Sequence, residues 1–91
     1  MNKVLKKVEL SDMHKDCLRD FLKVEVSAYS GEMKMPVYQW QNLQEHCKRE
    51  AQKIVDFHHN KLNDDLKSWV AYYKILERIC KFKLRKAIIT F

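Results

Sequence analysis

The chain has 91 residues, of which 46% are hydrophobic and 33% are charged, and its formal net charge is +6 at neutral pH. This length suits one small domain with a single modest core, and the hydrophobic fraction argues against a disordered chain. One glycine and one proline are too few for the turns of a β-sandwich or β-barrel, and they exclude glycine-rich loops that bind nucleotide phosphates. We therefore expect residues 1–91 to form a single all-α domain, a small bundle of three main helices.

The first helix is predicted over about residues 11–29. Ser11 and Asp12 are both residue types that favour a helix N-terminus. The β-branched stretch at residues 24–26 suits a helix less well, so we expect the helix to fray there before Gly31. Apolar residues follow the start at spacings of three and four: Leu10, Met13, Cys17, Leu18, Phe21, Val24 and Ala28.

The second and third helices are predicted over about residues 36–59 and 63–86. Pro36 suits the first position of a helix, and Asn63 suits the cap before Asp64 and Asp65. No glycine or proline separates the two helices, so one or two very long helices over residues 36–91 stay an open alternative. Period-two alternation near both ends leaves short terminal β-strands as a second alternative, in which residues 3–10 pair with residues 80–91.

Apolar residues cover more than half the circumference of the third helix, so we expect it to be covered on more than one side. The first helix is too short to cover the other two along their full length. The apolar surface that is left over predicts a non-enzymatic module that forms a homodimer or docks into a larger assembly. The residues expected at this contact are Trp69, Tyr72, Tyr73, Ile75, Ile79 and Phe82.

Residues 49–74 have a sequence pattern typical of a long helix. Its residues are Arg49-Glu50, Phe57, Lys61-Leu62, Asp64-Asp65-Leu66-Lys67 and Tyr73. This pattern resembles the last long helix of sorting-nexin-type BAR domains. The resemblance covers under a third of the chain and implies a long helix that packs against another copy.

Positive charge is concentrated at the two ends of the chain, in residues 1–8 and 78–91. The middle, residues 9–65, is net acidic. Cations alternate with apolar residues in the C-terminal segment, which favours nucleic-acid binding as the alternative function and an anionic membrane surface as a further one. A third interpretation is that the long aliphatic stems of these lysines and arginines cover an apolar helix while their charged ends stay solvated. The candidate residues for an anionic partner are Arg78, Lys81, Lys83, Arg85 and Lys86.

Catalytic and metal sites are not expected. His14 and Cys17 have the spacing of a metal-ligand pair, but a structural zinc site needs a second such pair. No nucleophile-elbow or Cys–His signature is present, so we expect no enzyme activity, no cofactor and no small-molecule substrate. Cys17, Cys47 and Cys80 each fall on the apolar stripe of a different helix, which is typical of buried free thiols.

The N-terminus lacks the apolar run of a signal peptide, and no stretch approaches the length of a membrane span. Three widely spaced cysteines are also untypical of a disulfide framework. We therefore expect an intracellular protein, either cytoplasmic or nuclear.

Overall fold

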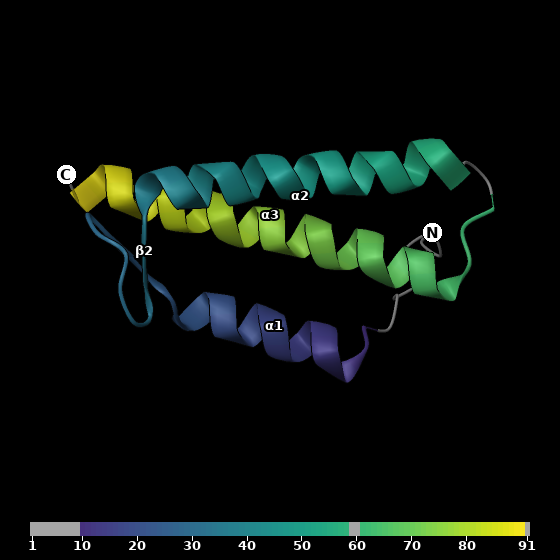
Figure 1. Cartoon of the computed structure of the whole chain (residues 1–91), viewed down its shortest axis with the longest axis horizontal. Helices are drawn as coiled ribbons and strands as arrows, with labels where there is room; N and C mark the ends of the chain where they lie inside the picture. The colour runs from purple at the N-terminus through teal and green to yellow at the C-terminus, as the bar shows by residue number, and fades with distance from the viewer. Residues whose placement is uncertain (1–9, 59–60, 91) are drawn as a thin grey trace, which may run out of the picture.

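The computed structural model describes residues 10–58 and 61–90, and three α-helices account for most of them. Figure 1 shows α1 (Asp12–Lys23), α2 (Val37–His58) and α3 (Asp64–Thr90), with α3 lying between the other two. Two short strands, β1 (Glu25–Ser27) and β2 (Lys34–Pro36), lie where α1 ends and α2 begins. The prediction of an all-α bundle of three helices is confirmed.

The first helix is shorter than predicted. Ser11 caps it as expected, because its Oγ atom accepts a hydrogen bond of 3.2 Å from the backbone N–H of His14. The helix ends at Lys23 rather than near residue 29, and Val24 has an extended backbone with φ −72° and ψ 130°. The β-branched residues at 24 and 26 account for this early end, since they favour the extended conformation.

Residues 25–36 form a small parallel strand pair that the sequence did not predict. Val26 of β1 lies opposite Met35 of β2, and the backbone N–H of Glu25 donates a hydrogen bond of 2.9 Å to the carbonyl oxygen of Met33. A tight turn over residues 31–34 returns the chain, and Met33 adopts φ 58° within it. The strands therefore occupy the segment between two helices, where we had placed the frayed end of a helix.

The second and third helices match their predicted positions closely. Pro36 is the last residue of β2, so α2 begins one residue later, at Val37. The second helix ends at His58 and the third begins at Asp64. Just before this start, the Oδ1 atom of Asn63 accepts a hydrogen bond of 2.8 Å from the backbone N–H of Leu66. Asn63 is thus the cap of α3, and the alternative of one continuous helix over residues 36–91 is wrong.

Two other expectations are also corrected by these helix bounds. Residues 49–74, which resemble a BAR-domain helix, are divided between α2 and α3 and do not form one long helix. The C-terminal residues up to Thr90 are helical, so the predicted terminal strand there is wrong. The partner strand in that alternative, residues 3–10, lies outside the described residues except for Leu10, which is not in a strand.

The core is built mainly between α2 and α3, and α1 adds to it from the other side of α3. Trp40 and Cys47 from α2 and Cys80 from α3 are fully buried at its centre. Burial of large side chains such as Trp40 stabilises the fold through the apolar area removed from water. The remaining members of the buried cluster are Leu18, Leu76 and Ile79.

Candidate interaction surface

The side of α3 that turns away from the core carries exposed side chains at helical spacing. Lys74, Arg78, Lys81 and Arg85 are all exposed, and their spacing of four, three and four residues aligns them along one face. Ile75 and Phe82 lie beside this row, with 37% and 54% of their surface exposed. We call this set, together with the half-buried Ala71, the outer face of α3: Ala71, Lys74, Ile75, Arg78, Lys81, Phe82 and Arg85.

The excess positive charge of the described residues resides in α3. The acidic and basic residues of α1 balance each other, as do those of α2, and each of these helices has a surface ion pair, Asp16–Arg19 at 3.0 Å and Glu50–Lys53 at 3.3 Å. In contrast, α3 has seven lysines and arginines against three acidic residues, two of which are in its first turn. The positive potential is therefore concentrated on the outer face rather than spread over the surface.

A shallow depression of about 490 Å³ lies on this face. Its walls combine aliphatic carbon with positive charge, since Ile75 and the stems of Lys74 and Arg78 line it alongside the small Ala71. Glu77 is its acidic lining residue, and it is half-buried. The described residues that line it are Ala71, Lys74, Ile75, Glu77, Arg78 and Lys81.

The predicted anionic-partner residues are not all on this face. Arg78, Lys81 and Arg85 lie together on it, and the Nζ atom of Lys86 sits 5.3 Å from the centre of the Phe82 ring at its edge. Lys83 instead turns towards α1, where its Nζ atom donates a hydrogen bond of 2.8 Å to the carbonyl oxygen of Leu22. Lys83 therefore joins two helices of the bundle and lies apart from the other predicted anionic-partner residues.

Two further observations support a structural role for Lys83. Its Nζ atom lies 5.9 Å from the centre of the Trp40 ring, within reach of a cation–π interaction. Burial lowers the pKa of Lys83, with Lys86 adding to the effect and Glu25 opposing it. The side chain is thus partly withdrawn from solvent, unlike its neighbours on the outer face.

The predicted partner-contact residues also divide into two groups. Ile75 and Phe82 are exposed on the outer face, as a contact residue must be. Ile79 is 7% exposed and belongs to the buried core cluster, so the structure places it in the core and not on the outer face. The reason is that two helices flank α3, which makes the residues on both flanks, including Ile79, part of the bundle's own core.

Trp69, Tyr72 and Tyr73 form an aromatic cluster with His14 within the bundle. The buried His14 ring lies 4.4 Å from the Trp69 ring and 4.7 Å from the Tyr72 ring, measured between ring centres. Tyr73 lies 5.8 Å from Trp69, and both tyrosines pack against the core. The contacts of His14 join α1 to α3, and Trp69, with 36% of its surface exposed, is more accessible than Tyr72 and Tyr73.

Burial also controls the chemistry of the tyrosines. Burial raises the pKa of Tyr72 to about 12, and Cys17, Cys47 and Tyr73 add smaller contributions in the same direction. The pKa of Tyr73 is raised by burial and then by Glu50 and Cys47. Both phenols are therefore neutral at physiological pH.

The three cysteines are free thiols on three different helices, as predicted. Burial raises the pKa of Cys47 to about 11 and that of Cys80 to about 12, with Glu77 contributing to both. Cys17 is half-buried, and its side chain helps to raise the pKa of Tyr72. Within residues 10–58 and 61–90, no group of three or more His, Cys, Asp or Glu side chains is placed to hold a metal ion.

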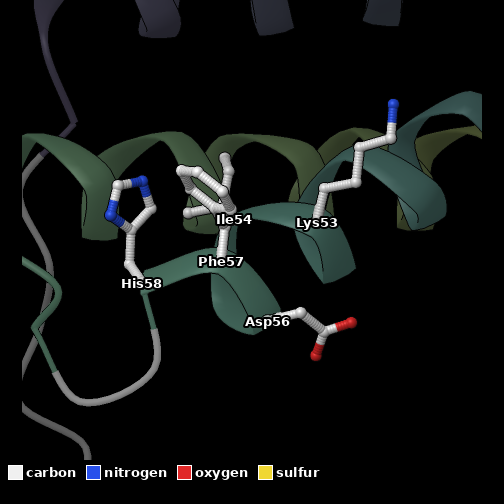
Figure 2. Close-up of a pocket in the computed structure, with 5 residues that line it drawn as sticks. All are labelled: Lys53, Ile54, Asp56, Phe57 and His58. Atoms are coloured by element: carbon white, nitrogen blue, oxygen red, sulfur yellow. The ribbon is translucent and has the colours of Figure 1, made fainter.

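A second depression, of about 570 Å³, lies at the end of α2 (Figure 2). Ile54 and Phe57 point to one side of the helix, whereas Asp56 points away. Among the described residues, those that line this depression lie within residues 53–58, at the end of α2. Phe57 has 83% of its surface exposed, and its ring centre lies 5.2 Å from that of His58.

Sequence reasoning missed Lys74 and Ala71 as members of the outer face. We began the basic segment at Arg78, because positive charges are uninterrupted from there on. The spacing of four residues from Lys74 to Arg78 and from Ala71 to Ile75 would have found both, since such pairs share a helix face.

We compared the chain with known families, proteins and structures. No family model, no curated protein and no solved structure matches this chain. None of the helices in the part of the chain that the structure describes is long and apolar enough to cross a membrane.

Proposed function

We propose that this chain is a non-enzymatic helical module that binds another protein through the outer face of α3. The observation that carries the proposal is the exposure of Phe82 and Ile75 beside the row of cations, on the side of α3 that faces neither α1 nor α2. Exposed aromatic and aliphatic side chains surrounded by charged residues are typical of protein contact surfaces, in which arginine and aromatic residues contribute most of the binding energy.

Charge favours a different protein over a second copy of this chain. A twofold dimer through the outer face would bring Arg78, Lys81 and Arg85 of one copy close to the same residues of the other. From residue 66 onwards the sequence offers one acidic residue, Glu77, to offset this repulsion. We therefore favour a heteromeric assembly over the homodimer.

The buried thiols Cys47 and Cys80 are not suited to act as nucleophiles. A reactive cysteine needs a lowered pKa, because the thiolate is the nucleophile. Cys47 and Cys80 have raised pKa values of about 11 and 12, so both are protonated at neutral pH. These buried residues serve packing instead.

Nucleic-acid binding is the second candidate, favoured by the alignment of Lys74, Arg78, Lys81 and Arg85 along one face. The exposed apolar residues beside that row support protein binding over this candidate, since Phe82 and Ile75 have no charge to offer a phosphate. The two functions also differ in salt dependence, which is steep where phosphate contacts dominate.

Comparative co-purification from cells that express the chain tests the proposal. A tagged wild-type chain is compared with Arg78→Glu/Phe82→Asp and with the matched control Arg49→Glu/Phe57→Asp, which makes the same changes at exposed positions of α2. Extracts are treated with nuclease, and bound proteins are quantified by mass spectrometry. We expect a set of proteins that is lost at least tenfold in the first variant and kept in the control. The same proteins with all three chains, or binding that nuclease abolishes, would overturn the proposal.

A further inference from the structure

We propose that the partner presents an acidic amphipathic α-helix, which packs lengthwise along the outer face of α3. This inference rests on the proposed function and specifies the partner's structure and charge. Two observations support it: the helical spacing of the outer-face residues around the depression, and the positive charge of most of them.

The depression has the composition of a helix-packing hole. When helices pack side by side, a side chain of one inserts between four residues of the other, at positions i, i+3, i+4 and i+7. Ala71, Lys74, Ile75 and Arg78 have this spacing, and all four line the depression. Ala71 is the smallest of them, which leaves room for a side chain to enter.

The same grouping repeats along the helix. Lys74, Glu77, Arg78 and Lys81 form a second set with this spacing and complete the lining of the depression. Arg78, Lys81, Phe82 and Arg85 form a third, one turn further on, in which Phe82 supplies the apolar wall. From Ala71 to Arg85 the seam is about 21 Å long, which a partner helix of roughly 15 residues would cover.

The charges of the seam determine what the partner helix must carry. Lys74, Arg78, Lys81 and Arg85 surround the holes, and their aliphatic stems can pack against an apolar side chain while their charges stay at the edge. A partner with apolar residues along its centre and Glu or Asp on both sides complements this arrangement. A lysine-rich helix would be repelled, and a rigid nucleic-acid duplex has no side chain to enter the holes.

A synthetic peptide tests this inference directly. The probe is a fluorescent 21-residue helix with leucine at the two central heptad positions, glutamate at the flanking positions, and alanine or glutamine elsewhere. The glutamates keep the peptide from pairing with itself. Two control peptides replace glutamate by lysine, or keep the composition but scatter the leucines around the helix. A 20-base-pair DNA duplex is the fourth probe, and binding is measured by fluorescence anisotropy at 0.1 M and 0.5 M salt.

We expect the acidic amphipathic peptide to bind at least tenfold more tightly than either control peptide. Ala71→Leu, which fills the hole with a good helix former, should weaken binding at least fivefold, and Arg78→Glu/Lys81→Glu at least tenfold. The matched variant Lys48→Glu/Arg49→Glu, which makes the same charge change on exposed positions of α2, should bind as the wild type does. Circular dichroism confirms that each variant keeps its helices.

Other outcomes separate this inference from the proposed function. Equal binding of the scattered-leucine peptide, with the same sensitivity to Arg78→Glu/Lys81→Glu, would overturn the helix-packing inference while supporting the outer face as a binding surface. Binding of the duplex alone would overturn both in favour of nucleic acid. No binding of any peptide would overturn the inference, and the proposed function would then be decided by co-purification.

Discussion

Lys83 and Leu22 are 61 residues apart in the sequence, and a hydrogen bond of 2.8 Å joins the Nζ atom of one to the carbonyl oxygen of the other. Leu22 lies in the last turn of α1, where backbone carbonyls lack partners within the helix. A lysine from α3 supplies that partner, and its positive charge also suits the negative end of the helix dipole. This bond fixes the end of α1 against α3, and it explains why one cation of the basic segment is not on the outer face.

Replacing Lys83 with methionine keeps an apolar stem and removes the donor. We expect the free energy of unfolding to fall by about 1 kcal/mol, the usual contribution of such a hydrogen bond. Urea denaturation followed by circular dichroism measures the change. Lys81→Met, on the exposed outer face, is the matched control and should change stability by less than about 0.5 kcal/mol. Equal effects of the two substitutions would contradict the assigned role of Lys83.

Ile79 should contribute much more to stability than Phe82. Ile79→Ala removes buried methyl groups from the core, so we expect a loss of about 2–4 kcal/mol in denaturant unfolding. Phe82→Ala removes a side chain that is 54% exposed and should cost about 1 kcal/mol or less. The prediction fails if Phe82→Ala proves the more destabilising of the two.

Stability should fall steeply in alkaline solution. The folded chain raises the pKa of Cys47 from 9.0 to about 11, of Cys80 from 9.0 to about 12, and of Tyr72 from 10.0 to about 12. Above pH 9 the unfolded chain therefore loses protons that the folded chain retains, so ionisation favours the unfolded state. Lys83 opposes the trend, because its lowered pKa makes the unfolded chain bind more protons and so favours folding as the pH rises. These three groups, together with Tyr73, whose pKa is also raised, outweigh Lys83.

We expect the free energy of unfolding to decrease by a few kcal/mol between pH 9 and pH 11, at 1.36 kcal/mol for each unit of pKa difference. Urea titrations at half-unit pH steps measure the decrease. Cys80→Ala tests the cause, because this variant should be less stable at pH 7 by about 1–2 kcal/mol and yet lose stability more slowly above pH 9. An unchanged slope in the variant would show that the thiol is not responsible.

The backbone of the turn before β2 is strained at Met33, and a glycine there should relieve the strain. Met33 has φ 58°, a left-handed conformation that costs a residue with a side chain roughly 1 kcal/mol. Half of the Met33 surface is exposed, so little packing is lost on its removal. Met33→Gly should therefore raise the melting temperature by a few degrees. Glu32→Gly, at the neighbouring position with negative φ, should lower it instead, and a fall in both variants would refute the strain.

Local signals were sufficient to predict most of the fold. Ser11 and Asn63 marked the starts of α1 and α3, and the spacing of Trp40 and Cys47 marked the buried side of α2. The strand pair was missed because its stability depends on a contact between residues 26 and 35, which periodicity along the chain does not reveal. The β-branched residues near Val26 gave the one local hint.

The outer face was only partly predictable for a related reason. An apolar stripe wider than half the helix showed that α3 is covered on two sides, but not which residues each neighbour covers. Ile79 and Phe82 therefore received the same assignment, although the structure buries the first and exposes the second. Lys83 was grouped with Arg85 for its charge, whereas its role depends on Leu22, which is distant in the sequence.

Photo-crosslinking from the outer face tests the central claim most directly, because it reports contact rather than co-purification. A benzoylphenylalanine is placed at position 82 or, as the matched control, at position 57, where the ring is more exposed but lies on α2. After irradiation of intact cells, we expect a defined protein crosslinked at position 82, absent at position 57, and lost on adding Arg78→Glu/Lys81→Glu. Crosslinks at position 57 alone, equal yields at both positions, or products at position 82 that nuclease removes would contradict the account.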